Sequence, residues 1–266
     1  WEPYPISIRL VNVIKYWLNG NCLEKTIFDN LYTQANYLFN NLEQHILANH
    51  YLTNLKAILF AGIIFQKDDW TSFATKELLK EIDEQLNNDY MNYELSPMYH
   101  ALMLVDFLDM FNLSRAYEDK FSSALSNKLK AKIPNMLNIL EQMSFLDGGL
   151  SFFNDSVDGI APKLDIISEY AENLHLKITE ITPNRELIDL SDSGFFILRD
   201  GPIKVIFNSS NIEPSYQPGH SHGDTLSLEA SFGEERLIVN SGISTYDDNN
   251  KRIFQRSTKS HSTLEI

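Results

Sequence analysis

The sequence contains a single cysteine, Cys22, among 266 residues. One thiol excludes an intrachain disulfide framework and leaves the cellular compartment open. Basic residues are also scarce, because 22 Lys and Arg stand against 36 Asp and Glu, for a net charge of −14. Nucleic-acid binding needs a basic surface, so this balance argues against a nucleic-acid partner. An anionic polymer would need a locally positive cleft.

Long apolar runs are missing as well. The longest, residues 57–65, falls well short of the roughly eighteen residues that a membrane span requires. We find no internal repeat and no low-complexity tract. The chain starts at Trp1 and stops at residues 263–266, a pattern typical of the opening of a strand. We therefore expect a piece of a longer protein, and its 43% hydrophobic content suffices for a substantial core.

Helical periodicity dominates from residue 5 to about residue 143. Apolar positions recur at helical spacing, as in Ile6, Leu10 and Ile14, and Ser96-Pro97 is typical of a helix start. The pattern predicts helices at about 5–18, 23–40, 42–65, 70–86 and 96–111, more helix over 114–143 with a break or kink near Pro134, and a short helix at 162–174. Successive helices with short breaks predict antiparallel hairpins in a bundle or toroid.

From residue 193 the apolar period changes to two. Alternation over 193–199, 205–207, 226–232, 237–239 and 264–266 predicts strands, and Gly201-Pro202 predicts a hairpin turn. We therefore expect an α+β multidomain chain, with a helical domain over residues 1–180 and an antiparallel β domain over 190–266, the boundary lying near 176–190.

Two histidines, His220 and His222, follow a Pro-Gly break and precede a predicted strand. If strand geometry already holds there, both project from one face. Such imidazoles can act as metal ligands, as proton-transfer groups or as one of each. A polar loop entering a strand is the simpler alternative.

Polar residues also gather on two predicted helices. Asn49, His50 and Asn54 share one face of the third helix, which faces either solvent or a polar cleft. Tyr99 lies in the first turn of the fifth helix, flanked by Glu94 and His100 (Tyr93-Glu94-Leu95-Ser96-Pro97-Met98-Tyr99-His100). A tyrosine at a helix start usually serves packing, so spacing alone leaves its role open.

A metal site is a further possibility in the β part. Zinc commonly binds imidazole nitrogens together with an oxygen. His222 and His261 could supply the nitrogens, whereas Asn240 could offer only a neutral carbonyl oxygen, and Asp224 is the nearest carboxylate. The alternative is that these histidines are merely hydrogen-bonded at strand ends.

Taken together and in order, seven segments across nearly the whole chain resemble the heparinase II/III-like polysaccharide lyases. These segments are residues 7–12, 48–54, 94–100, 153–156, 220–224, 240–246 and 256–261. The resemblance implies an incomplete α/α toroid of antiparallel helix hairpins followed by an antiparallel β-sandwich. The first toroid helices and most of the sandwich would then be missing from this chain.

The resemblance also implies an activity: a carbon–oxygen lyase that cleaves a uronic-acid polysaccharide by β-elimination. This chemistry needs neutralisation of the C6 carboxylate, a base for the C5 proton and an acid for the departing O4. By similarity, the catalytic residues are Asn49 and His50 for the carboxylate, Tyr99 as acid and also as candidate base, and His220 as the other proton-transfer group or a subsite contact. The resemblance further implies substrate contacts at Asn54, Glu94, His100, Arg252 and Arg256. The guanidinium groups of Arg252 and Arg256 suit a carboxylate or a sulfate, and solvated surface is the alternative for both.

By the same resemblance, a structural zinc site would use His222, His261 and Asn240, where the family usually has Asp in place of the asparagine. No organic cofactor is expected, the partner would be an anionic polysaccharide or oligosaccharide, and the location would be periplasmic or secreted. Two alternatives stay open: a C5 uronyl epimerase on the same fold, and a non-catalytic glycan-binding protein of envelope polysaccharide metabolism. The sequence does not identify the polysaccharide.

Overall fold

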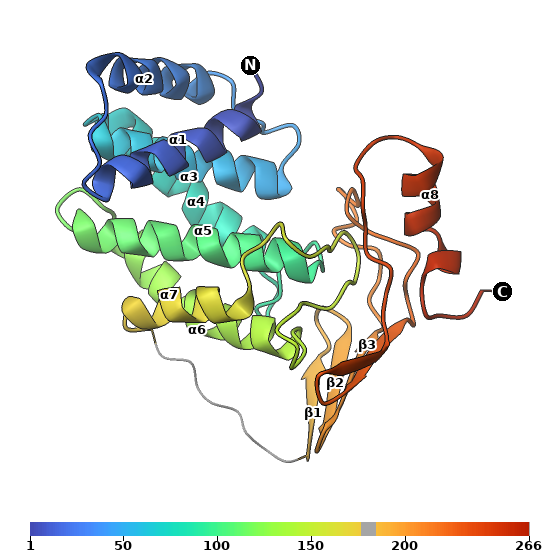
Figure 1. Ribbon diagram of the computed structural model, residues 1–266. Helices are drawn as coiled ribbons and strands as arrows, with labels where there is room; N and C mark the ends of the chain where they lie inside the picture. Colours follow the sequence, from blue (N-terminus) through green and yellow to red (C-terminus); the bar gives the residue numbers. More distant parts are fainter. Residues whose placement is uncertain (177–184, 266) are drawn as a thin grey trace. The chain divides into compact units, whose positions relative to one another are not determined.

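The computed structural model describes residues 1–176 and 185–265 (Figure 1). Within these, the chain divides into two compact units. The first consists of residues 1–84 and 106–130, and the second of residues 85–105 and those from 131 onward. No helix in the described part is long and apolar enough to cross a lipid bilayer.

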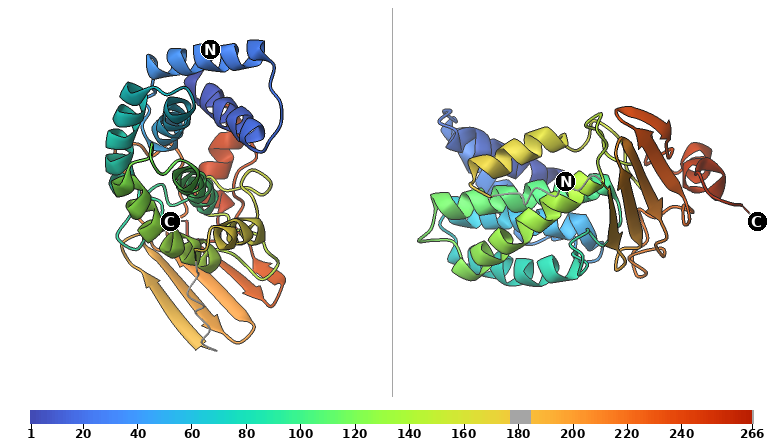
Figure 2. Two further views of the ribbon diagram at one scale, coloured as in Figure 1. Left: turned by 90° about the vertical axis from the view of Figure 1, so that its left-hand side faces the viewer. Right: turned by 90° about the horizontal axis from the view of Figure 1, so that it is seen from below.

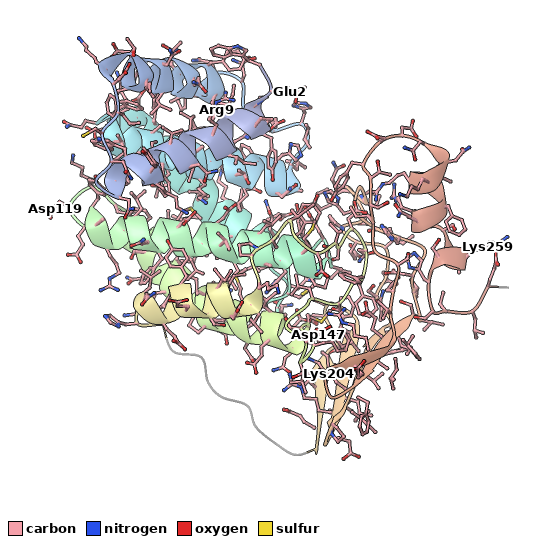
Figure 3. All side chains as sticks on the ribbon, viewed as in Figure 1. Glu2, Arg9, Asp119, Asp147, Lys204 and Lys259 are labelled. Atoms are coloured by element: carbon pink, nitrogen blue, oxygen red, sulfur yellow. The ribbon has the colours of Figure 1, made fainter. Side chains whose placement is uncertain are left out.

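The first unit is helical. It contains α1 (Pro3–Leu18), α2 (Lys25–Phe39), α3 (Ala48–Ile64) and α4 (Asp68–Glu84). Ile6, Leu10 and Ile14 are buried on α1, as their spacing predicts. α3 is buried along almost its whole length because it packs against α1, α2 and α4. Arg9 on α1, labelled in Figure 3, donates from Nε to Gln34 Oε1 on α2 at 2.7 Å.

Two further helices, α5 (Pro97–Ala116) and α6 (Ser123–Gln142), contribute residues to both units. The sequence predicts a break or a kink near Pro134. α6 runs through Pro134 as one helix, so the break is absent and only a kink is compatible with the structure. The short helix α7 (Leu164–Asn173) lies in the second unit, close to its predicted range.

The second unit also carries a five-stranded antiparallel sheet in which each strand pairs with the next along the chain. Its strands are β1 (Arg185–Leu190), β2 (Phe195–Asp200), β3 (Ile203–Asn208), β4 (Leu228–Phe232) and β5 (Glu235–Ile238), side by side in Figure 2. One face of the sheet packs into a core of buried apolar residues: Met91, Leu95, Ile139, Met143, Phe145, Phe153, Leu190, Phe195, Ile197 and Ile206. Lys204 on the same face, labelled in Figure 3, donates from Nζ to the carbonyls of Glu141 and Ser144.

The opposite face of the sheet carries exposed apolar side chains, among them Leu187, Leu198 and Ile203. The cross-strand pair Leu187 and Leu198 places two of them next to each other. A second sheet covers such a face in a β-sandwich. The described residues contain a single sheet, so no second sheet covers this face within them. The structure confirms the predicted order, in which helices precede an antiparallel β part.

Several predicted boundaries are wrong. The third helix begins at Ala48 instead of about 42, because Leu47 and Ala48 have φ of 61° and 52° and cannot continue a helix. Leu226, with φ of 65°, precedes the strand that starts at Leu228. Residues 264–265 are not in a strand, and Ile266 lies outside the described residues. The domain boundary predicted near 176–190 stays a prediction: residues 185–190 form β1, and residues 177–184 lie outside the described residues.

The β part also contains helices that periodicity did not predict, namely α8 (Asn250–Arg256) and a 3-10 turn at Thr258–Ser260. The Asn249 side chain caps α8 by accepting from Arg252 N at 3.0 Å. This helix places Arg252 and Arg256 on one short element near the polar residues of the second unit.

Candidate active site

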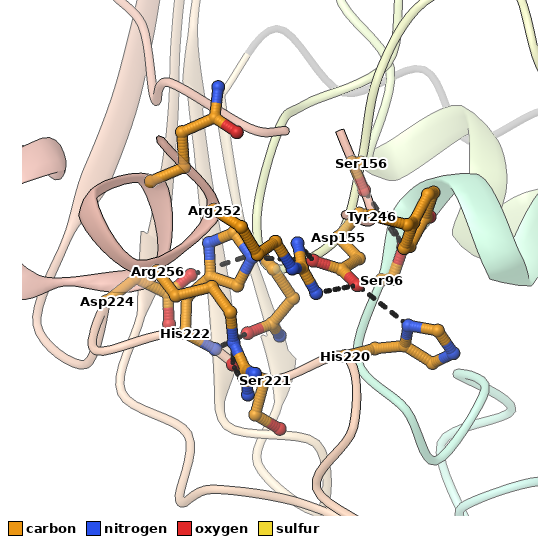
Figure 4. Close-up of polar contacts among 12 residues, drawn as sticks. Ser96, Asp155, Ser156, His220, Ser221, His222, Asp224, Tyr246, Arg252 and Arg256 are labelled. Carbon is orange, nitrogen blue, oxygen red and sulfur yellow. Dashed lines mark hydrogen bonds and ion pairs between the residues drawn. The ribbon is translucent and has the colours of Figure 1, made fainter. Parts of the chain in front are cut away.

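A buried carboxylate, Asp155, organises the polar residues of the second unit (Figure 4). Its Oδ2 lies 2.8 Å from His220 Nδ1, and its Oδ1 lies 2.7 Å from His222 Nε2. Arg252 donates to both oxygens, at 2.5 and 2.6 Å. Asp155 therefore joins the two histidines of the H-x-H motif through one side chain.

The charge of Asp155 is stabilised by these partners. Burial alone would raise its pKa, but the hydrogen bonds from His220, His222 and Arg252 outweigh burial and hold the pKa well below its usual range. An ionised carboxylate only accepts hydrogen bonds, so both imidazoles donate to it. The proton on His220 is thus at Nδ1, and Nε2 is the nitrogen that can accept a proton.

The two histidines do not lie on a strand, so the strand geometry that would place both on one face does not hold, and the alternative of a polar loop before a strand is the one observed. They lie in the segment between β3 and β4, and Asn154 and Asp155 hold that segment through the backbone. His222 N donates to Asn154 Oδ1 at 3.0 Å, and Asp155 N donates to the His220 carbonyl at 3.1 Å. Asn154 adopts φ of 54°, a left-handed conformation that asparagine tolerates better than most residues.

Tyr99 is in contact with His220. The two ring centroids are 4.1 Å apart, and the Tyr99 hydroxyl lies 2.9 Å from the hydroxyl of Tyr246. Burial, followed by the interaction with Tyr246, raises the pKa of Tyr99 far above its ordinary value. The phenol therefore stays protonated at neutral pH and can donate a proton.

The start of α5 is tied to the same cluster. Ser96 Oγ accepts from Tyr99 N at 3.3 Å and donates to the Asp155 carbonyl at 2.9 Å. Ser96 and Asp155 are labelled in Figure 4. Ser96 is thus the helix cap that its sequence predicts. Glu94 is buried, with Oε2 3.9 Å from His220 Nε2. The second unit therefore brings together Tyr99, His220 and Glu94 among the predicted site residues.

Asn49 and His50 belong to the first unit, in the opening turn of α3. The His50 ring stacks on Tyr4 with centroids 4.4 Å apart, and its Nδ1 lies 3.2 Å from Glu43 Oε1. His50 is one-third exposed, at 32% of its side-chain surface. The structure thus places these two residues on a partly accessible helix start.

Two predicted substrate contacts are buried instead. Asn54 is 0% exposed, and its amide bonds to Glu43 and to Ser7 Oγ. His100 is also 0% exposed: its Nδ1 accepts from Asn92 N, and its Nε2 lies 2.8 Å from the Met136 carbonyl. Burial lowers the pKa of His100 to about 4. In the described structure both side chains contact protein groups and neither reaches solvent, and their predicted role as substrate contacts stays a prediction.

The two arginines are likewise engaged within the second unit. Arg252 is paired with Asp155, and Arg256 donates from Nε and Nη2 to the Ser221 carbonyl at 3.0 and 2.8 Å. Arg256 also donates to the Pro218 carbonyl, so it holds the segment that carries His220. In the described structure, Arg252 therefore pairs with the central carboxylate, and Arg256 holds the backbone of the segment that carries the two histidines.

The predicted metal residues are close together. The rings of His222 and His261 have centroids 5.2 Å apart, and His261 Nδ1 is hydrogen-bonded to Asn240 Oδ1. His222 Nδ1 and His261 Nε2 are buried without a hydrogen-bond partner. Burial, and then the neighbouring His222, lower the pKa of His261 to about 4, so this ring is neutral and able to bind a metal at pH 7.

These two nitrogens fit a divalent cation, because unsatisfied buried nitrogens are what such an ion would pair with. The oxygen ligand fits less well, since Asn240 is neutral and its oxygen already accepts from His261. No group of three or more His, Cys, Asp and Glu side chains in the described ranges is arranged to hold a metal. Asp224, the nearest carboxylate in sequence, instead accepts from Asn154 N and from Asn208.

Sequence reasoning missed three residues of these clusters: Asp155, Tyr246 and Glu43. Asp155 and Tyr246 lie in segments on which the family resemblance rests, 153–156 and 240–246, but Asn154-Asp155-Ser156 also fits an ordinary turn. Glu43 had no signal beyond lying seven residues before His50. Their importance comes from tertiary contacts.

The structure has a helical part followed by an antiparallel sheet, and the rings of Tyr99 and His220 are in contact. Both features agree with the heparinase II/III-like class that the seven segments resemble. The family model for the heparinase II/III N-terminus matches residues 1–180. The model described as heparinase II/III-like, C-terminal, matches residues 182–266. The chain belongs to the heparinase II/III family.

Two curated relatives are similar over most of the chain. A heparin-sulfate lyase of Pedobacter heparinus is 25% identical over 295 residues, covering 100% of this chain and 44% of that protein. A heparin-sulfate lyase of Bacteroides thetaiotaomicron is 22% identical over 255 residues, covering 82% of this chain and 36% of that protein. The chain thus spans less than half the length of both relatives.

Solved structures share the fold. A crystal structure of heparinase III aligns with a TM-score of 0.80 at 19% identity, over 100% of this chain and 47% of that one. The heparan sulfate lyase HepC from Pedobacter heparinus aligns with a TM-score of 0.67 at 22% identity, over 100% of this chain and 45% of that one.

Proposed function

We propose that the protein to which this chain belongs cleaves a uronic-acid-containing polysaccharide by β-elimination. The observation that carries the proposal is the contact between Tyr99 and His220, with His220 Nδ1 bonded to the buried carboxylate of Asp155. One residue of the pair can accept a proton, and the other can donate one. β-Elimination needs both a base that takes the C5 proton and an acid that protonates the departing O4 of the same glycosidic linkage.

In this mechanism, His220 Nε2 removes the C5 proton of the uronate. The electron pair forms the C4–C5 double bond, the C4–O4 bond breaks, and the Tyr99 hydroxyl gives its proton to O4. The Tyr99 phenol is protonated at neutral pH and therefore carries the proton that the departing O4 takes up. Asp155 keeps the proton of His220 on Nδ1, so that Nε2 is the base.

Neutralisation of the substrate carboxylate is the task that we propose for Asn49 and His50, on the family resemblance. An amide and an imidazole can donate hydrogen bonds to the carboxylate and to the enolate-like intermediate. Sulfated heparan-type polymers are the first substrates to test, because both curated relatives are named heparin-sulfate lyase.

The test is the ultraviolet absorbance of the unsaturated uronate when the full-length protein is incubated with a panel of uronate polymers. We expect a rise on at least one polymer. No rise, with deuterium exchange at C5, would indicate the epimerase. Binding without either signal would indicate a glycan-binding protein.

We also propose that His222 and His261 bind a structural divalent cation, zinc being the first to test. When bound, the ion would accept the lone pairs of the two buried nitrogens and cross-link the segments that carry His222 and His261, with no part in the elimination. Elemental analysis of purified full-length protein should find about one zinc per chain, and a chelator should lower the melting temperature. Metal-free protein with an unchanged melting temperature would contradict the site.

On the family resemblance, we propose a periplasmic or secreted location. Fractionation of cells that produce the full-length protein tests this directly. Recovery in the cytoplasmic fraction alone would contradict it.

A further inference from the structure

His50 is held on two sides within the first unit. Tyr4 of α1 stacks on one face of the imidazole at a centroid distance of 4.4 Å and an angle of 27°. The carboxylate of Glu43 lies at the ring edge, with Oε1 3.2 Å from Nδ1. Stacking fixes the plane of the ring, and the carboxylate determines which edge faces inward.

Glu43 is itself fixed by Asn54, one helical turn beyond His50. Asn54 Nδ2 donates to Glu43 Oε2 at 3.0 Å, and Asn54 Oδ1 accepts from Glu43 N at 2.9 Å. Asn54 Nδ2 also donates to Ser7 Oγ, at 3.1 Å, and Ser7 donates to the Pro3 carbonyl. A fully buried amide thus holds both the backbone and the side chain of Glu43.

The backbone between Glu43 and His50 is strained. Leu47 has φ of 61° and ψ of −154°, a region populated almost only by glycine, and Ala48 has φ of 52°. Ile46 N and Leu47 N both donate to the Glu43 carbonyl, which closes the turn. Two non-glycine residues persist in such conformations only where surrounding contacts enforce them, and Glu43 and Asn54 supply such contacts here.

We infer that Glu43 is a positioning residue for His50. Its carboxylate accepts a hydrogen bond from Nδ1–H and thereby leaves Nε2 of His50 as the nitrogen that faces the substrate, where the doubly protonated ring donates to a carboxylate. Asn54 and the strained turn fix where α3 begins. The side-chain accessibility of His50, 32%, against 9% for Glu43, agrees with this division between a presenting and a supporting residue. The role of His50 toward a substrate carboxylate rests on the proposed function.

The first test is on the full-length protein and needs no substrate. Nitrogen-15 spectra of histidine-labelled protein report which ring nitrogen is protonated, and His50→Gln identifies the signal. We expect a proton on Nδ1 of His50 in the unmodified protein, because the hydrogen bond of one ring nitrogen determines the state of the other. A neutral ring with its proton on Nε2 alone would overturn the inference.

The second test uses Glu43→Gln, with Glu118→Gln, an exposed acid of the same unit, as the matched control. We expect kcat/KM to fall by about tenfold to a hundredfold in Glu43→Gln, as for a displaced substrate-positioning group, and the Nδ1 signature of His50 to change. The control should alter neither. A melting temperature near that of the unmodified protein separates this result from unfolding.

The outcomes separate the two proposals. An inactive unmodified protein with the Nδ1 proton in place would contradict the proposed lyase function and leave the Glu43 contact supported. An active protein in which Glu43→Gln folds and keeps both kcat/KM and the His50 signature would overturn the role of Glu43. If Glu43→Gln does not fold, the spectrum of the unmodified protein decides.

Discussion

The two units each contain a cluster built around buried carboxylates, and the clusters differ in the groups that pair with those carboxylates. In the first unit, Lys56 Nζ lies 2.7 Å from Asp106 and 2.6 Å from Asp109, and Lys15 lies 2.7 Å from Asp109. In the second unit, Asp155 is paired with one guanidinium and two imidazoles. The carboxylates of the first cluster pair with ammonium groups, whereas Asp155 pairs with imidazoles, which are the usual proton-transfer groups at neutral pH.

The pKa shifts alone do not distinguish the two clusters, because in both of them charged partners outweigh the effect of burial. Burial would lower the pKa of Lys56, but Asp106 and Asp109 outweigh it and raise the pKa above 10.5. Burial is outweighed for Asp155 in the same way. What distinguishes the second cluster is a proton acceptor and donor pair, His220 and Tyr99, of which His220 keeps 22% of its side chain exposed. A buried network of charged groups therefore indicates a catalytic site only where it includes a proton acceptor and a proton donor that a ligand can reach.

The strongest test of this contrast is Tyr99→Phe in the full-length protein. Removing the proposed acid should lower kcat by about a thousandfold, while glycan binding and the melting temperature stay close to their original values. Tyr16→Phe, at a tyrosine 54% exposed in the first unit, is the control. Retained turnover in Tyr99→Phe would exclude Tyr99 as the acid.

Asp155→Asn should affect both activity and stability. The variant leaves Arg252 buried without its carboxylate, which typically costs about 3–5 kcal/mol, and it lets His220 adopt the wrong tautomer, which should lower kcat by at least about a hundredfold. Denaturant unfolding and steady-state kinetics measure the two effects. The exposed Asp158→Asn is the control, and a stable Asp155→Asn protein with normal kcat would show that the cluster is dispensable.

These residues also show what a sequence can and cannot predict. Apolar spacing located α1, α2 and α4 to within a few residues, because periodicity reports burial directly. It failed at residues 42–47, where Leu42 and Leu47 continue an apolar pattern although contacts of Glu43 force a turn. It also failed for α8, which at seven residues is too short to show a period.

For the site, residue type identified Tyr99 and His220 as candidates, and the structure brings their rings into contact. Residue type could not show that Asn54 and His100 are fully buried, because a polar residue can lie on either the buried or the exposed face of a helix. The sequence around Asp155 fits an ordinary turn, and it cannot show that Asp155 is buried, because its partners lie 65 to 97 positions away in sequence.

Lys56→Met tests the other side of the contrast. Removing the ammonium leaves Asp106 and Asp109 short of a buried partner, so the free energy of unfolding should fall by about 3–5 kcal/mol. Activity of the folded fraction should stay within about threefold, as for a change away from the proton-transfer groups. Lys80→Met, at a lysine 59% exposed, is the control. A large loss of kcat without loss of stability would mean that the lysine cluster takes part in catalysis.

The smallest expected effect is on the pH dependence of stability. Burial would raise the pKa of Asp109, but Lys56 and Lys15 outweigh it and lower the pKa below 3.8. The stability that Asp109 contributes is therefore complete above its unfolded pKa and is lost as the pH falls through the lower folded pKa, at about 1.4 kcal/mol for each unit between the two. Urea unfolding between about pH 2 and pH 6, the range that brackets ordinary carboxyl pKa values, should show a shallower acid decline in Asp109→Asn than in the exposed control Asp29→Asn. Equal slopes would mean that the lysine cluster does not stabilise the ionised carboxylate.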